Sequence, residues 1–157
     1  MHRDISLVAD IGGTNTRVAL ARGFEIDRDT VRRYSTSGVS GLDVHLARYM
    51  TDMQPGKLTG ACVAIAGPVR DGVGQMTNLD WRVDRESLGN ATGARKLAVL
   101  NDLQAQGHAL GHLEESDLAR QLPQPDAARH AARLVVGLGT GFNAAPVYDT
   151  VGGRFVP

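Results

Sequence analysis

Short apolar runs separated by turn residues mark the first part of the chain, a pattern that is typical of strands. Residues 5–11 form an apolar run that ends at a glycine pair, and residues 16–22 place apolar side chains on one face. Together they predict two strands joined by a tight β-hairpin. The charged stretch 30–36 predicts a third strand. Apolar side chains then recur at helical spacing over 41–53, which predicts an amphipathic helix.

The remainder of the chain alternates strand and helix patterns. We expect strands over 62–66, 75–78, 97–100, 134–137, 143–149 and 154–156, and helices over 85–90 and 103–113. The polar stretch 114–133, which contains two internal prolines, predicts a short helix followed by a surface loop. This order of elements predicts an α/β fold with a mixed sheet.

Composition excludes several classes of protein. The 157 residues carry 17 basic and 17 acidic side chains, and a net charge of zero gives no electrostatic footprint for nucleic acid or an anionic membrane. The chain has no signal peptide pattern and no apolar stretch long enough to cross a bilayer. Its single cysteine, Cys62, lies in an apolar run and is interpreted as an inert core residue. We therefore expect a soluble, cytoplasmic protein.

The first candidate site is the turn between the first two strands, where Asp10 precedes Gly12, Gly13, Thr14 and Asn15. Glycines let backbone N–H groups converge on an anion, and the two polar side chains add donors. The carboxylate of Asp10 can hold Mg²⁺ directly or through water. The alternative is an ordinary hairpin turn. The acid before the glycines and the donors after them favour a phosphate site.

A second glycine-rich loop, with Gly139, Thr140 and Gly141, follows the strand expected at 134–137. A dinucleotide fingerprint requires a helix directly after such a loop, and a P-loop requires a lysine. Here a strand pattern follows and the lysine is missing. We interpret the loop as a second phosphate-binding hairpin, with a structural turn as the alternative.

Asn101 and Asp102 lie where an expected strand ends and an expected helix begins. Asp102 is either the N-cap of that helix or a catalytic group at a strand end. In the second case its carboxylate accepts the proton of a substrate hydroxyl that attacks a phosphorus atom.

Several other polar or aromatic residues have two interpretations each. Asn78 is a ligand of a sugar hydroxyl or a loop anchor, and Trp81 is interpreted as a packing residue rather than a sugar-stacking platform. His108 and His112 share one face of an expected helix, but a third ligand is not evident nearby, so we interpret them as a solvated face. Arg17 either forms a structural ion pair or contacts phosphate.

Together these motifs resemble the bacterial glucokinases of the hexokinase, Hsp70 and actin superfold. The family patterns D-x-G-G-T-N-x-R-x-A-L, A-x-A-G-P, T-N-x-x-W, N-D-[FL]-x-A and G-x-G-T-G are matched by residues 10–20, 64–68, 77–81, 101–105 and 137–141. The motifs occur in family order and cover essentially the whole chain. One departure is Asn143, which stands where the family usually has the last glycine of the second loop.

The resemblance implies a mixed-sheet, ribonuclease H-like (actin-like ATPase) α/β fold. It implies ATP-dependent phosphorylation of glucose or a related hexose at the 6-hydroxyl, with Mg²⁺ as cofactor. Asp102 would be the general base, and Asn101, Asn78 and Gly67 would bind the sugar. The two glycine loops would hold the phosphates. The alternative is a non-catalytic sugar- or phosphate-binding remnant of the same fold.

Length is the largest departure from the family, whose members are about twice as long, as expected of two-domain kinases. Residues 1–112 resemble a nearly complete small domain, and residues 113–157 resemble the beginning of a large domain. We therefore expect a truncated chain, or one that forms a homodimer or associates with a missing C-terminal half. The activity of the 157 residues alone is left open.

Overall fold

The computed structural model describes residues 4–119, 121, 128, 131–138, 142–150 and 155–156. The chain divides into two compact units, Met1–Asp102 and Leu103–Pro157. The first unit ends at Asp102, whereas the resemblance predicts a small domain that extends to about residue 112. That domain boundary stays a prediction.

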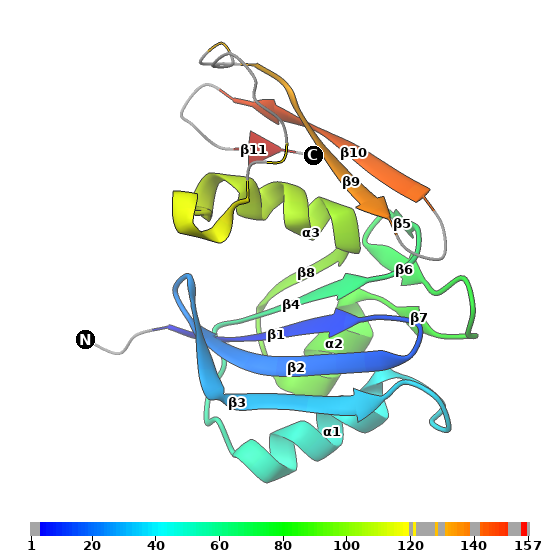
Figure 1. Cartoon of the computed structure of the whole chain (residues 1–157). Coiled ribbons are helices and arrows are strands. Elements are labelled where there is room, and N and C mark those ends of the chain that lie inside the picture. The colour runs from blue at the N-terminus through cyan, green and yellow to red at the C-terminus, as the bar shows by residue number, and fades with distance from the viewer. Residues whose placement is uncertain are drawn as a thin grey trace. The chain divides into compact units, whose positions relative to one another are not determined.

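A five-stranded mixed sheet forms the centre of the first unit (Figure 1). Its strands are β1 (Ile5–Ile11), β2 (Asn15–Arg22), β3 (Glu25–Ser35), β4 (Gly60–Ile65) and β8 (Lys96–Asn101), in the order β3-β2-β1-β4-β8. The first three strands form an antiparallel meander, whereas β4 runs parallel to β1 and β8 runs parallel to β4. Parallel strands require long crossover connections. Those that lead to β4 and β8 carry the helices α1 (Leu42–Met53) and α2 (Arg85–Thr92).

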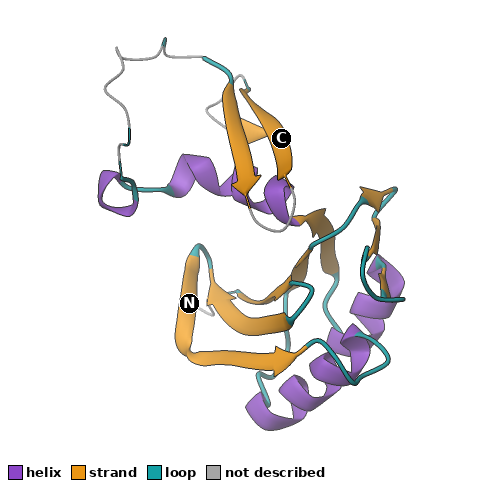
Figure 2. Cartoon of the chain, turned by 45° about the vertical axis from the view of Figure 1, so that its right-hand side comes forward, coloured by secondary structure: helices purple, strands orange, loops and turns teal. Residues whose placement is uncertain are grey.

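Both helices cover the same face of this sheet (Figure 2). Helix α1 buries a stripe at helical spacing that consists of Leu42, His45, Leu46 and Tyr49. Alternate residues of β1 point to the same core, because side chains of a strand alternate between the two faces: Leu7, Ala9 and Ile11. The core is largely aliphatic, as the low content of aromatic residues predicts.

A small antiparallel sheet of β5 (Val69–Arg70), β6 (Val73–Gln75) and β7 (Arg82–Val83) precedes α2. The strand predicted at 75–78 is wrong, because β6 ends at Gln75. There the chain turns into a loop that is closed by a hydrogen bond from the N–H of Met76 to the carbonyl of Trp81 (3.0 Å).

The described part of the second unit contains a three-stranded sheet and short helices. Helix α3 (Asp102–Ala109) starts at the last residue of the first unit and is followed by the 3₁₀ turns η1 (Leu110–His112) and η2 (Glu115–Asp117). The helix predicted to extend to residue 113 therefore tightens after Ala109. The strands β9 (Arg133–Leu138), β10 (Phe142–Asp149) and β11 (Phe155–Val156) form an antiparallel sheet in the order β11-β10-β9.

Candidate active site

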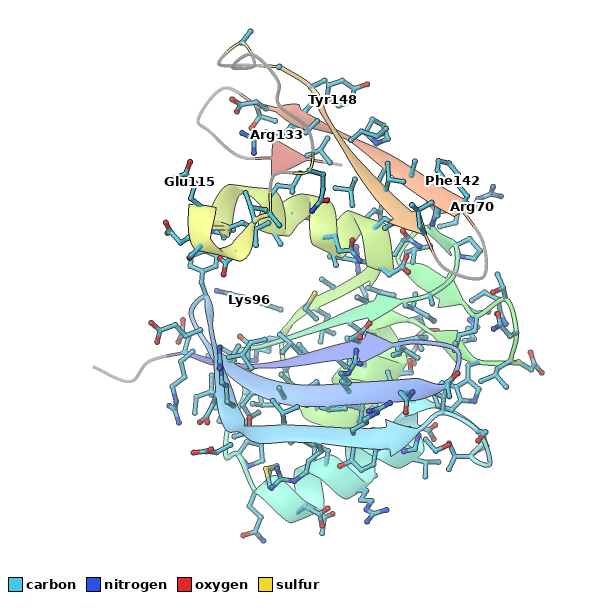
Figure 3. All side chains as sticks on the ribbon, viewed as in Figure 1. Arg70, Lys96, Glu115, Arg133, Phe142 and Tyr148 are labelled. Atoms are coloured by element: carbon cyan, nitrogen blue, oxygen red, sulfur yellow. The ribbon has the colours of Figure 1, made fainter. Side chains whose placement is uncertain are left out.

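The carboxyl ends of β1, β4 and β8 meet at one edge of the five-stranded sheet, which we call the carboxyl edge. Ile11 on β1 pairs with Ile65 on β4, and Ile65 pairs with Asn101 on β8. The residues that follow these strands therefore begin side by side. Lys96 marks the opposite, amino end of β8 (Figure 3). Open α/β sheets place their ligands at the carboxyl edge.

Three sequence-predicted groups come together at the carboxyl edge. The glycine loop, residues 12–15, follows β1, whereas Gly67 and Asp102 follow β4 and β8. A hydrogen bond from the N–H of Ala66 to the carbonyl of Ile11 (2.9 Å) extends the pairing of β1 with β4 into these segments.

Backbone hydrogen bonds shape the glycine loop. The N–H of Gly12 donates to the carbonyl of Asn15 at 2.9 Å, and the N–H of Thr36 donates to the carbonyl of Thr14 at 2.9 Å. Gly13 and Thr14 are exposed, and neither N–H donates to a backbone carbonyl among the described residues. The loop can therefore offer backbone N–H groups and the Thr14 hydroxyl to an anion.

Charged side chains flank the glycine loop on β1, β2 and β3. Arg17 forms an ion pair with Asp10 across β1 and β2, with 3.0 Å between Nη1 and Oδ2, and each side chain is about half exposed. This is the structural ion pair that was one of the two interpretations of Arg17. The guanidinium of Arg33 donates from Nε to Oδ1 of Asn15 at 2.9 Å. Sequence reasoning missed Arg33, because only the pairing of β2 with β3 brings it to the loop.

The donor set at this edge fits a magnesium ion that takes most of its ligands from elsewhere. No group of three or more His, Cys, Asp or Glu side chains suited to a metal ion occurs in the described part of the chain. Mg²⁺ usually keeps several waters and binds through one or two carboxylates together with substrate phosphates. The carboxylate of Asp10, exposed beside the glycine loop, suits that arrangement.

Asn78 lies against the glycine loop. A Cβ atom added to Gly13 would lie 2.8 Å from Nδ2 of Asn78, so the amide of Asn78 occupies the space that a side chain at Gly13 would need. The hydroxyl of Thr77 donates to Oδ1 of Asn78 at 2.5 Å and orients the amide.

Gly67 lies where two backbone segments pass very close together. A Cβ atom at this position would lie 2.1 Å from the carbonyl oxygen of Gln75, which is far below any van der Waals contact. The carbonyl of Gly67 accepts a hydrogen bond from Nδ2 of Asn101 at 2.9 Å. The hydrogen bond between Gly67 and Asn101 therefore ties the end of β8 to the segment after β4. It gives a structural role to both residues.

Asp102 is a half-buried residue in the first turn of α3. A carboxylate in the first turn interacts favourably with the positive end of the helix dipole. The helix includes Asp102 as its first residue. The carboxylate of Asp102 is thus held at the carboxyl edge by the first turn of α3.

The second predicted phosphate loop cannot be compared with the structure, because Gly139, Thr140 and Gly141 lie outside the described residues. The strands on either side of them form a hairpin, in which Leu138 pairs with Phe142. The element after the loop is therefore a strand, as predicted. This finding argues against a dinucleotide fingerprint, which requires a helix at that point.

The remaining candidates agree with their simpler interpretations. Trp81 is buried and donates from Nε1 to the carbonyl of Val39 at 3.2 Å. His108 and His112 are exposed. Cys62 is partly buried, and burial raises the pKa of its thiol, so the reactive thiolate is disfavoured. The helices among the described residues are all too short or too polar to cross a membrane.

The fold defines the class of protein. An antiparallel meander continued by parallel strands, with helices on one face of the sheet, agrees with the predicted ribonuclease H-like, actin-like fold. Within that class the chain belongs to the glucokinase family, whose model, described as Glucokinase, matches residues 7–156.

Curated relatives and solved structures agree with this assignment. A glucokinase of Caulobacter vibrioides (strain NA1000 / CB15N) is 35% identical over 146 residues, which are 90% of this chain and 43% of the relative. A glucokinase of Ralstonia nicotianae is 30% identical over 154 residues, which are 96% of this chain and 44% of the relative. The chain therefore spans less than half the length of these relatives.

Two crystal structures give the same result for the fold. A glucokinase from an Antarctic psychrotroph superposes with a TM-score of 0.79 at 29% identity, over 98% of this chain and 49% of that chain. A glucokinase from Balamuthia mandrillaris, solved in complex with glucose, superposes with a TM-score of 0.64 at 26% identity, over 98% of this chain and 47% of that chain.

Proposed function

We propose that this chain carries the small-domain part of an ATP-dependent hexose kinase that phosphorylates glucose, or a related hexose, at the 6-hydroxyl. The observation that carries the proposal is the register of β1, β4 and β8, which brings the glycine loop, Gly67 and Asp102 to one edge. Membership of the glucokinase family supports the reaction, and the glucose complex of the Balamuthia mandrillaris glucokinase supports the substrate.

In the proposed reaction Asp102 is the general base. Its carboxylate accepts the proton of the sugar hydroxyl as the hydroxyl oxygen attacks the terminal phosphorus of ATP. The bond from that phosphorus to the bridging oxygen breaks, and ADP leaves. Asn101, Asn78 and Gly67 bind the sugar near that hydroxyl. The hydrogen bond to the carbonyl of Gly67 fixes the orientation of the Asn101 amide, so the sugar meets a preorganised polar surface.

The glycine loop holds the phosphates in this proposal. The backbone of Gly12 and Gly13 and the polar groups of Thr14 and Asn15 bind the terminal phosphate oxygens. Asp10 would hold Mg²⁺, directly or through water, and a bound ion would supply positive charge beside the transferred phosphoryl group. The loop of Gly139, Thr140 and Gly141 in the second unit is proposed to bind phosphate as well.

Further properties are proposed from family membership. They are a cytoplasmic location, a place at the first step of glycolysis, and a second half of the enzyme that is supplied by a partner copy or by a C-terminal half. A non-catalytic sugar- or phosphate-binding protein is the second candidate function. The observation that favours it is the exposed glycine loop, which can bind an anion without any turnover.

Glucose-dependent release of ADP from ATP and Mg²⁺ tests the proposal, with wild type compared with Asp102→Asn. Loss of a general base lowers kcat by roughly 10² to 10⁴. The matched control is Asp52→Asn, which removes a carboxylate from the last turn of α1, at the end of the helix that leads to the amino end of β4. It should leave kcat unchanged.

Calorimetric titrations with glucose and with inorganic phosphate separate the remaining outcomes. A wild-type chain that binds glucose without turnover supports the non-catalytic candidate. A chain that shows no turnover and binds neither glucose nor inorganic phosphate contradicts both candidates. Equal kcat values for wild type and Asp102→Asn would show that Asp102 is not the base.

A further inference from the structure

Thr36 holds the glycine loop from the interior of the first unit. It directly follows β3 and is completely buried. Its N–H donates to the carbonyl of Thr14 at 2.9 Å, and its hydroxyl donates to the carbonyl of Gly12 at 3.0 Å. One residue therefore binds two carbonyl groups of the loop.

A second buried threonine completes this contact. The hydroxyl oxygens of Thr16 and Thr36 lie 3.2 Å apart, and both side chains are 0% exposed. Because the single hydroxyl proton of Thr36 is donated to Gly12, the Thr16 hydroxyl is the donor between the two. The result is a chain of hydrogen bonds from Thr16 through Thr36 to Gly12, shielded from water and therefore costly to interrupt.

This contact fixes the direction of an N–H group that the loop offers to its ligand. A peptide bond is planar and trans, so the C=O of one residue and the N–H of the next point in opposite directions. The carbonyl of Gly12 is directed at the buried hydroxyl of Thr36. The N–H of Gly13, in the same peptide unit, therefore points away from Thr36, and Gly13 is exposed.

The peptide unit between Gly12 and Gly13 needs such a restraint. With glycine on both sides it lacks the steric barriers that side chains impose on backbone rotation. If the unit flipped, the carbonyl oxygen of Gly12 would face the ligand in place of the N–H of Gly13, and it would repel an anion.

We propose that Thr36 is a positioning residue that fixes the orientation of the peptide unit between Gly12 and Gly13, so that the N–H of Gly13 is directed at the bound anion. The identity of that anion, the terminal phosphate of a nucleotide, rests on the proposed function. The orientation of the peptide unit does not depend on it.

Three substitutions separate positioning from general stability. Thr36→Val removes the hydroxyl but keeps the shape of the side chain, and Thr36→Ser restores the hydroxyl. The matched control is Thr59→Val. The hydroxyl of Thr59 donates to the carbonyl of Ile5 at 2.9 Å, which is the same kind of bond at the opposite end of β1. If Thr36→Val fails to fold, Thr36→Cys replaces the hydroxyl with the weaker S–H donor.

The experiment uses NMR on the whole chain with two readouts. The residual dipolar coupling of the Gly13 N–H reports its direction without any ligand, and titration with inorganic tripolyphosphate reports anion binding through the Gly13 amide signal. In Thr36→Val we expect an altered coupling and a dissociation constant raised roughly tenfold, the upper effect of one lost hydrogen bond. Thr36→Ser and Thr59→Val should match wild type in both readouts.

The two readouts test two separate statements, the orienting role of Thr36 and the phosphate-binding function of the glycine loop. An unchanged coupling in Thr36→Val, or in Thr36→Cys if that variant is used, overturns the proposal, as does a changed coupling in Thr59→Val. If the coupling changes as expected but the wild-type Gly13 signal does not respond to tripolyphosphate, the phosphate-binding function of the loop is wrong while the orienting role of Thr36 stands.

Discussion

His45 is a buried polar residue inside an aromatic cluster. Its ring stacks on Tyr34 with 4.9 Å between ring centroids and lies 5.7 Å from the ring of Trp81. Among the described residues, neither Nε2 of His45 nor the hydroxyl of Tyr34 has a hydrogen-bond partner. Burial lowers the pKa of His45, an effect that a hydrogen bond with the Ser35 backbone partly opposes and that the nearby charge of Arg48 reinforces.

Acidification should therefore destabilise the first unit through His45. Below about pH 6.5 the imidazole takes up a proton in the unfolded chain, whereas the folded chain keeps it neutral to lower pH. The unfolded state then binds more protons, so the free energy of unfolding falls as the pH falls. His45→Phe keeps a stacking ring and removes this titration. Urea unfolding at pH 8 and pH 5.5 should show that wild type loses more free energy of unfolding than the variant on acidification. If the free energies of unfolding of the two proteins differ by the same amount at both pH values, the prediction is contradicted.

At the residue scale, the sequence predicts the exposed chemistry of the site better than its buried support. Asp10, the glycine loop and Asp102 stand out as polar residues and glycines next to apolar runs. Thr16 and Thr36 do not, because an isolated threonine in a strand pattern is ordinary, and only the pairing of β2 with β3 places the two hydroxyls together.

Helix α2 is short, and its first turn is held by a capping box. The N–H of Ser87 donates to Oδ1 of Asp84 at 2.9 Å, and the N–H of Asp84 donates to the hydroxyl of Ser87 at 3.2 Å. Hydrogen bonds from the backbone and side chain of Ser87 lower the pKa of Asp84. The C-terminus is closed by Gly93 in the left-handed conformation at φ 66°.

Removal of this cap should be measurable in the free energy of unfolding. Asp84→Ala should lower it by about 1 kcal/mol, the usual effect of losing an N-cap side chain. Asp84→Ser keeps a capping oxygen and should recover most of the loss. Glu86→Ala removes a charge from the same turn without touching the cap and should cost about 0.5 kcal/mol or less. If Asp84→Ala costs no more than Glu86→Ala in urea unfolding, the capping box does not stabilise the helix.

At the scale of elements, periodic segments could be predicted, whereas two of the two-residue strands could not. The predicted strand 5–11 coincides with β1, and the predicted helix 41–53 differs from α1 by one residue at its start. The strands β5 and β7 were missed because two residues cannot show a period. They form through pairing with β6, which is a tertiary contact that no local pattern encodes.

At the scale of the whole molecule, the sheet of the second unit exposes one apolar face. Directly paired residues of β9 and β10 share a face, and the exposed ones are Leu134, Val136, Leu138, Phe142, Ala144, Pro146 and Tyr148. Leu138 and Phe142 are 82% and 72% exposed, and Phe142 and Tyr148 mark β10 in Figure 3. Contiguous apolar surface of this kind marks an interaction site or promotes association.

The chain by itself should therefore bind a hydrophobic dye and self-associate. Replacing Phe142, at the end of the apolar face, with lysine puts a charge into that face and should lower both dye fluorescence and association, because a desolvated ammonium opposes burial. The matched control is Phe24→Lys, which removes an exposed phenyl ring from the turn between β2 and β3, beside the charged residues Arg22 and Glu25. Dye binding and sedimentation velocity measure the two effects. A strictly monomeric wild type that does not bind the dye would contradict the prediction, and equal effects of the two substitutions would show that the apolar face is not responsible.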